Sequence, residues 1–131
     1  MIGLDTNVIV RYIVQDDVVQ SKQATALFET FSQETPGFIT VVVVIELAWV
    51  LQGCYGSTRA EIVEVLDRLM RAKDIVIEHH ESVWHALHTF ANSKADLSDC
   101  LIERFCYAAH CQYTVTFDKG ASKSTGMQLL E

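Results

Sequence analysis

The chain has 131 residues, half of them hydrophobic, and its single proline and six glycines leave no repeat or low-complexity segment, so one folded domain over residues 1–131 is expected. Seventeen acidic against ten basic residues give a formal net charge of −7, which excludes broad nucleic-acid affinity through a basic surface. Any phosphate chemistry would therefore need bound cations. The first residues lack the pattern of a secretory signal, and the longest apolar stretch is too short to span a membrane, which predicts a cytoplasmic protein.

The first predicted strand is the apolar run over residues 1–4, which ends at Asp5 and leads into helical spacing over residues 8–13. Continuous apolar residues are typical of a parallel strand that is buried on both faces. Asp5 is therefore expected at the carboxyl edge of a central strand, where sites lie in open α/β sheets. The alternative is that Asp5, Thr6 or Asn7 only caps the helix.

The elements that follow are separated by turn and capping residues. Thr40 divides a long apolar stretch into a strand through Ile39 and a helix that it caps, and Thr58 with Glu61 forms a capping box for the next helix. The other expected elements are a helix after the cap Asp16–Asp17, a strand over 75–77, a helix over 82–91, a helix capped by Ser98, a strand over 113–116, a turn over 118–120 and a weak edge strand over 127–130. Alternating strands and helices predict an α/β domain with a parallel five-stranded sheet ordered 3-2-1-4-5 and helices on both faces.

Glu46 is the most informative acidic residue, because it lies in a predicted helix that is otherwise apolar over residues 41–51. Burial of an unpaired carboxylate costs roughly several kcal/mol. Glu46 therefore needs a base, a metal ion or a shared proton as its partner. The alternative is a salt bridge to a buried arginine.

Asp96, Asp99 and Asp118 can each be explained, when taken alone, as an ordinary loop, turn or helix-start residue. Asp99 suits the first turn of a helix, where the macrodipole favours a negative charge, and Asp118 suits a turn. Asp96 is either a loop acid or an auxiliary partner of Asp99. In a sheet ordered 3-2-1-4-5, however, the first and fourth strands are neighbours, so Asp5 and Asp118 are expected to converge.

The flanking helices are expected to bring Glu46 and Asp99 to the same edge, and four carboxylates that face one another require cations. Oxygen ligands of this number and charge suit Mg²⁺ or Mn²⁺ better than Zn²⁺. The chemistry to expect is phosphoryl transfer, in which such ions activate water and stabilise the attacking and leaving oxygens.

The motifs that carry these acids resemble those of PIN-domain ribonucleases, in particular the VapC toxins of bacterial type II toxin–antitoxin pairs. They are Leu4-Asp5-Thr6-Asn7, Glu46 in an apolar helix, residues 95–102 around Asp96 and Asp99, and Thr116-Phe117-Asp118. Their order and the chain length both match the family. The resemblance implies a PIN-like fold and a metal-dependent endoribonuclease in which Asp5, Glu46, Asp99 and Asp118 hold Mg²⁺ or Mn²⁺ directly or through water.

The same resemblance implies helper residues and partners. Asp96 would be an auxiliary acid, and Thr6, Asn7 and Thr116 would orient the metal-binding carboxylates by hydrogen bonds. The partners implied are an RNA substrate and an antitoxin that lays a cationic side chain in the acidic pocket, and a homodimer is also expected.

Two other functions compete with this interpretation. An aspartyl-phosphate phosphatase or receiver-like domain also places acids at strand ends, but the phosphatase needs a second acid where this chain has Asn7. A receiver needs an acid at the end of its third strand, where this chain has Glu78. A catalytically inactive module that only binds a partner is the other candidate, and retention of all four acids disfavours it.

Overall fold

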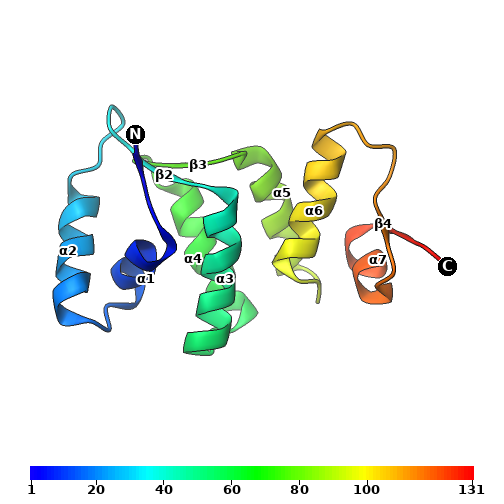
Figure 1. Cartoon of the computed structure of the whole chain (residues 1–131), viewed down its shortest axis with the longest axis horizontal. Helices are drawn as coiled ribbons and strands as arrows, with labels where there is room; N and C mark the ends of the chain where they lie inside the picture. Colours follow the sequence, from blue (N-terminus) through cyan, green and yellow to red (C-terminus); the bar gives the residue numbers. More distant parts are fainter. The chain divides into compact units, whose positions relative to one another are not determined.

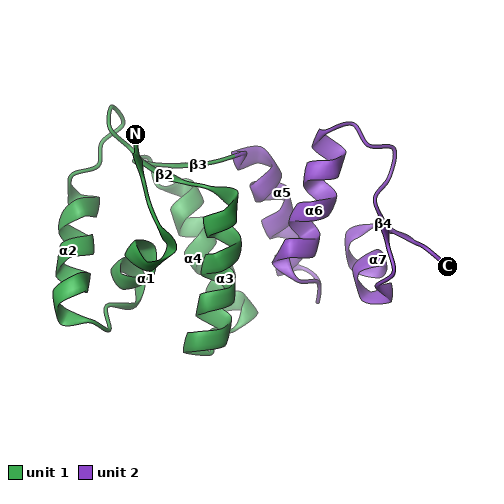
Figure 2. Ribbon diagram, viewed as in Figure 1, with its two compact units in different colours: residues 1–78 green, residues 79–131 purple.

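The computed structural model describes all of residues 1–131, and the chain forms two compact units, residues 1–78 and residues 79–131 (Figure 1 and Figure 2). Helices and short parallel strands alternate along the chain, which confirms the predicted α/β class. The assignment of residues 1–131 to one domain stays a prediction. None of the helices has both the length and the apolar character needed to cross a lipid bilayer.

The first unit contains a three-stranded parallel sheet with β2 in the centre, between β1 and β3. Its elements in chain order are β1 (Ile2–Gly3), α1 (Thr6–Val14), α2 (Val18–Glu29), β2 (Gly37–Ile39), α3 (Val41–Tyr55), α4 (Arg59–Arg71) and β3 (Ile75–Ile77). Helix α1 packs against α2 and α3, and α3 packs against α4. The largest side chains that this packing buries completely are Ile9, Ile39, Val44, Leu47 and Leu66.

The long apolar stretch divides where the sequence predicts. Strand β2 ends at Ile39, and the hydroxyl of Thr40 accepts a hydrogen bond of 3.2 Å from the backbone N–H of Val43 at the start of α3. A second cap comes from Glu78, whose carboxylate accepts a hydrogen bond of 3.0 Å from the N–H of Val41. The valines of this stretch are helical despite their β propensity, because most of them are buried in the core.

Two further helix starts follow the predicted capping signals. The backbone N–H of Glu61 donates to the hydroxyl of Thr58, and the carboxylate of Glu61 accepts from the backbone N–H of Thr58, so the capping box before α4 is confirmed. Asp17 caps α2 by accepting a hydrogen bond from the N–H of Gln20. Local capping signals in the sequence therefore locate the starts of both helices.

The second unit consists of three helices and a two-stranded parallel sheet. Its elements in chain order are α5 (His80–Ala91), α6 (Leu97–Ala108), β4 (Val115–Thr116), α7 (Lys119–Thr125) and β5 (Gln128–Leu129). Helices α5 and α6 pack against each other, and α7 packs against α6 and both strands. The buried residues of this unit include Val83, Ala86, Leu87, Phe90, Leu97, Cys100 and Leu101.

The predicted sheet is wrong in one respect. The strands form a three-stranded sheet and a two-stranded sheet, and not one five-stranded sheet ordered 3-2-1-4-5, although the neighbours 3-2-1 and 4-5 are as predicted. β1 and β4, which were expected to pair, each contain only two residues and offer few ladder hydrogen bonds. Burial of the first strand on both faces is also wrong, because Ile2 and Gly3 are exposed and only Leu4 is buried.

The predicted ends of two elements are also wrong. Helix α6 begins at Leu97 with Asp96 at its N-cap, and Ser98 therefore lies inside the first turn. The predicted turn over residues 118–120 is the start of α7, which runs to Thr125 and ends at Gly126 in a left-handed conformation. Apolar spacing did not predict α7, because Ala121 is its only buried residue.

Candidate active site

Asp5 lies directly before α1 and caps it. Its Oδ1 accepts a hydrogen bond of 2.8 Å from the backbone N–H of Thr6, so the capping role that the sequence left open for Asp5 is confirmed. Asp5 is nevertheless exposed, although Leu4 directly before it is buried. The carboxylate is therefore both fixed in position and open to solvent.

Glu46 is exposed, which corrects the expectation that it is buried. It shares one face of α3 with Val42 and Trp49, which are 66% and 61% exposed. Its partner is a hydroxyl and not an arginine, because the Oγ1 of Thr6 donates a hydrogen bond of 2.9 Å to Oε1 of Glu46. The buried arginine considered as an alternative is therefore not its partner.

Thr6 connects the two acidic residues of the first unit. It is buried, its backbone N–H donates to Asp5, and its hydroxyl donates to Glu46. The two carboxylates, 41 positions apart in the sequence, are thus held by one residue. Thr6 thus orients Asp5 through its backbone N–H and Glu46 through its hydroxyl. Asn7 is exposed, and its side chain makes no hydrogen bond to either carboxylate.

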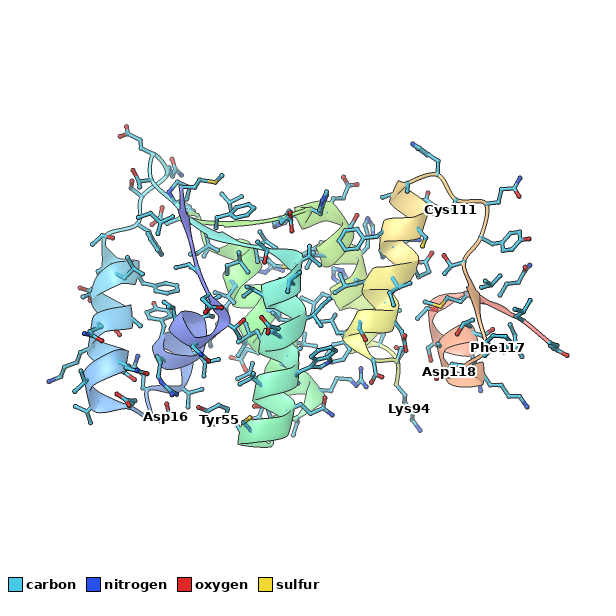
Figure 3. All side chains as sticks on the ribbon, in the orientation of Figure 1. Asp16, Tyr55, Lys94, Cys111, Phe117 and Asp118 are labelled. Atoms are coloured by element: carbon cyan, nitrogen blue, oxygen red, sulfur yellow. The ribbon has the colours of Figure 1, made fainter.

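The second unit gathers three acids around one small pocket. The pocket has a volume of about 120 Å³ and is lined by Lys94, Ala95, Asp96, Asp99, Asp118, Gly120, Ala121 and Ser124. Asp96 is the N-cap of α6, and Asp99 lies in its first turn, half-buried. Asp118, which is labelled in Figure 3, comes from the N-cap of α7. The starts of two helices therefore supply the acids.

The three acids interact electrostatically. Burial raises the pKa of the Asp99 carboxyl above its ordinary value of 3.8, and the negative charges of Asp96 and Asp118 raise this pKa further. The ionised form of Asp99 is therefore disfavoured in the metal-free protein. A cation in the pocket would offset both causes.

Thr116 and the first turn of α7 position Asp118. The backbone N–H of Asp118 donates a hydrogen bond of 3.0 Å to the hydroxyl of Thr116, and Oδ1 of Asp118 accepts one of 2.9 Å from the N–H of Ala121. Thr116 thus fixes the backbone of Asp118, whereas it was expected to orient the carboxylate directly. The carboxylate of Asp118 is exposed, and the residue lines the pocket.

Comparison with known protein families finds a PIN domain over residues 2–125, which includes every acid described above. The chain belongs to the PIN-domain family. PIN domains are generally nucleases that act on nucleic acid and use divalent metal ions such as Mg²⁺. No curated protein matches the chain at a significant level.

The acids of this PIN domain fit a hard divalent ion by their chemistry. The candidate ligands are all carboxylate oxygens, which Mg²⁺ and Mn²⁺ prefer, and the raised pKa of Asp99 indicates a position where added positive charge is favourable. The acids of each unit are, however, too far apart for three of them to hold one ion. The same is true of the histidines and cysteines of each unit.

Two features of the PIN domain's acidic groups have no simple signal in the sequence. Ser124 lines the pocket of the second unit but belongs to α7, which apolar spacing did not predict. The hydrogen bond from Thr6 to Glu46 joins residues 40 positions apart, so no local pattern reveals it. The only sequence feature that points to this hydrogen bond is the position of Thr6, whose hydroxyl directly follows Asp5 at the end of the first predicted strand.

We expect a pH dependence of the metal-free PIN domain that arises from Asp99. Because its pKa is raised in the folded state, its contribution to stability is fully present below the unfolded pKa and is lost as the pH rises through the folded pKa. Carboxyl-carbon NMR of the metal-free protein should therefore show Asp99 titrating above 3.8. Asp96→Asn should lower that pKa, and an Asp99 that titrates at or below the ordinary value would contradict the described pocket.

Proposed function

We propose that this PIN domain is a Mg²⁺- or Mn²⁺-dependent endoribonuclease in which Asp5, Glu46, Asp99 and Asp118 bind the metal. The observation that carries this proposal is the family match over residues 2–125, because it spans all four acids. Two contacts within the units support it. Thr6 holds Asp5 and Glu46, and Asp99 shares its pocket with Asp118.

Each of these side chains has a distinct role in the proposal. The carboxylates of Asp5, Glu46, Asp99 and Asp118 bind metal directly or through water. The bound ions supply a positive charge that acidifies water and stabilises the leaving oxygen of the phosphodiester. The hydroxyl of Thr6 keeps Glu46 in place, Thr116 fixes the backbone of Asp118, and Asp96 adds negative charge beside Asp99. Asn7 is proposed to orient a metal-binding carboxylate through a water molecule.

We further propose that the protein is the VapC-type toxin of a toxin–antitoxin pair. The order of the acidic motifs supports this assignment. The proposed antitoxin would place a cationic side chain beside the acids and compete with metal, as opposite charges at short range do. A homodimer is proposed as its assembly.

A receiver-like or phosphatase function is less well supported than a nuclease. Glu78, the acid at the end of β3, is engaged with the N-terminal N–H of α3 and is not available as a free phosphoryl-site acid. A catalytically inactive binding module stays a second candidate, and retention of all four acids in the matched region argues against it.

The ends of the RNA products test the proposed mechanism. Attack by water in line with the 3′-oxygen breaks the P–O3′ bond, so the products should carry 5′-phosphate and 3′-hydroxyl ends. Treatment with end-specific phosphatase and kinase, followed by mass spectrometry of a short RNA, distinguishes these ends. A 2′,3′-cyclic phosphate would show that the 2′-hydroxyl is the nucleophile and would contradict the mechanism.

A further inference from the structure

The first unit contains a pocket that the proposed chemistry does not use. Its volume is about 280 Å³, and it is lined by Asn7, Val8, Arg11, Gln20, Gln23, Ala24 and Leu27 from α1 and α2. Asn7 follows Asp5, the cap of α1, by two residues, which corresponds to a rise of about 3 Å along a helix. The pocket therefore begins at the end of α1 that carries the acid.

The pocket combines apolar walls with amide groups. Val8, Ala24 and Leu27 supply apolar surface. The side-chain amides of Asn7 and Gln23 are exposed, and neither makes a hydrogen bond within the protein. Each amide offers one acceptor and two donor hydrogens to a ligand. The volume of about 280 Å³ lies just below the range of about 300 to 1,000 Å³ that is typical of pockets for drug-sized ligands, so the pocket suits a smaller ligand.

Arg11 forms a fixed wall of this pocket. Its Nε donates a hydrogen bond of 2.7 Å to Gln20, and its Nη1 donates to Asp16 at 3.2 Å and to the hydroxyl of Tyr55 at 3.3 Å. Tyr55 in turn donates to Asp16 at 2.8 Å, and Figure 3 shows these two side chains near each other. The guanidinium is thus held by three partners, which leaves it less able to form the bidentate pair that guanine requires.

We propose that this pocket binds one unstacked nucleobase of the RNA substrate, with a preference for adenine. Adenine presents an adjacent acceptor and donor, N7 and the N6 amino group, and Asn or Gln amides match this pair. Single-stranded RNA is generally recognised through such splayed bases, whose apolar faces need apolar walls. The assignment of this base to the substrate rests on the proposed nuclease function, because the lining of the pocket begins at Asn7, two residues after Asp5.

The test uses the full-length wild-type protein and small ligands that it cannot cleave. The side-chain amide signals of Asn7, Gln20 and Gln23 are followed by ¹⁵N NMR during titration with AMP, CMP or ribose 5-phosphate. AMP should shift these signals, and CMP and ribose 5-phosphate should shift them much less. Gln23→Ala should weaken AMP binding by about tenfold, as expected for loss of a base-specific hydrogen-bonding group.

Gln52→Ala is the matched control, because Gln52 is an exposed glutamine of the same unit that lies outside the pocket. It should leave AMP binding unchanged, and both variants should keep the backbone spectrum of the wild type. Equal shifts with AMP and ribose 5-phosphate, or no shift at the pocket, would overturn the inference even if the protein cleaves RNA. AMP-specific shifts in a protein that cleaves no RNA would support the pocket and contradict the proposed nuclease function.

Discussion

The Asp99→Asn variant is expected to lose Mg²⁺- or Mn²⁺-dependent RNA cleavage by roughly 100- to 1,000-fold, the usual effect of removing one group that stabilises charge in the transition state. The loss should occur without unfolding. Burial and the neighbouring acids raise the pKa of Asp99, so its charge is unfavourable in the metal-free fold. A neutral side chain of the same shape should therefore leave the metal-free melting temperature unchanged or higher.

Glu103→Gln is the control for this substitution, because Glu103 lies one turn further along α6 and pairs with Arg104 at 2.6 Å. This variant removes one negative charge from the same helix but should keep full cleavage activity. Cleavage rates and melting temperatures of both variants are compared with those of the wild type. A large drop in the metal-free melting temperature of Asp99→Asn would assign Asp99 a structural role instead.

Leu47→Ala should be the most destabilising of the variants considered for the first unit. Leu47 follows Glu46 in α3 and is completely buried. Its truncation leaves a cavity in the core and should lower the free energy of unfolding by about 2–5 kcal/mol. Urea denaturation followed by circular dichroism measures this loss directly.

Val42→Ala provides the comparison for Leu47→Ala within the same helix. Val42 is 66% exposed, so its truncation should change the free energy of unfolding by no more than about 0.5 kcal/mol. Similar losses for the two variants would mean that α3 does not pack through the Leu47 face. The face of α3 that carries Glu46 would then not be the exposed face.

The elements that the sequence predicted correctly are those with local signals. Thr40 ends one element and starts the next through its own hydroxyl, and Thr58 with Glu61 forms a capping box within four residues. Such contacts form between near neighbours in the chain, so the order of residue types is enough to indicate them. The boundary between β2 and α3 followed from this rule despite the four consecutive valines.

Contacts between residues that are far apart in the sequence could not be predicted from such local signals. The exposure of Glu46 depends on which face of α3 packs against α1 and α4. Because α3 is apolar on nearly all sides, its sequence does not indicate which face is buried. The pairing of strands depends on their length, and β1 and β4 are shorter than their apolar runs suggested. Helix α7 buries only Ala121, so it carries no apolar period.

In the candidate site, too, the residue types could be predicted from the sequence, and their contacts could not. Acids that follow strands or precede helices could be identified from the sequence. Asp5 and Asp99 lie at helix starts that the sequence indicated, whereas Asp118, predicted in a turn, caps α7. Their partners could not be identified, because the hydroxyl that holds Glu46 comes from Thr6 in another helix. Residue types thus indicated the chemistry, and tertiary packing determined the contacts.

Cleavage of total RNA by the wild type and by Glu46→Gln, with and without Mg²⁺ or Mn²⁺, tests the metal-dependent role of the acids most directly. Glutamine can still accept the hydrogen bond from Thr6 and occupies an exposed position, so the fold should be preserved while one negative charge is lost. We expect the wild type to cleave RNA only when a divalent ion is present and Glu46→Gln to be inactive. Cleavage that persists in the chelator EDTA, or equal activity of the two proteins, would contradict this account.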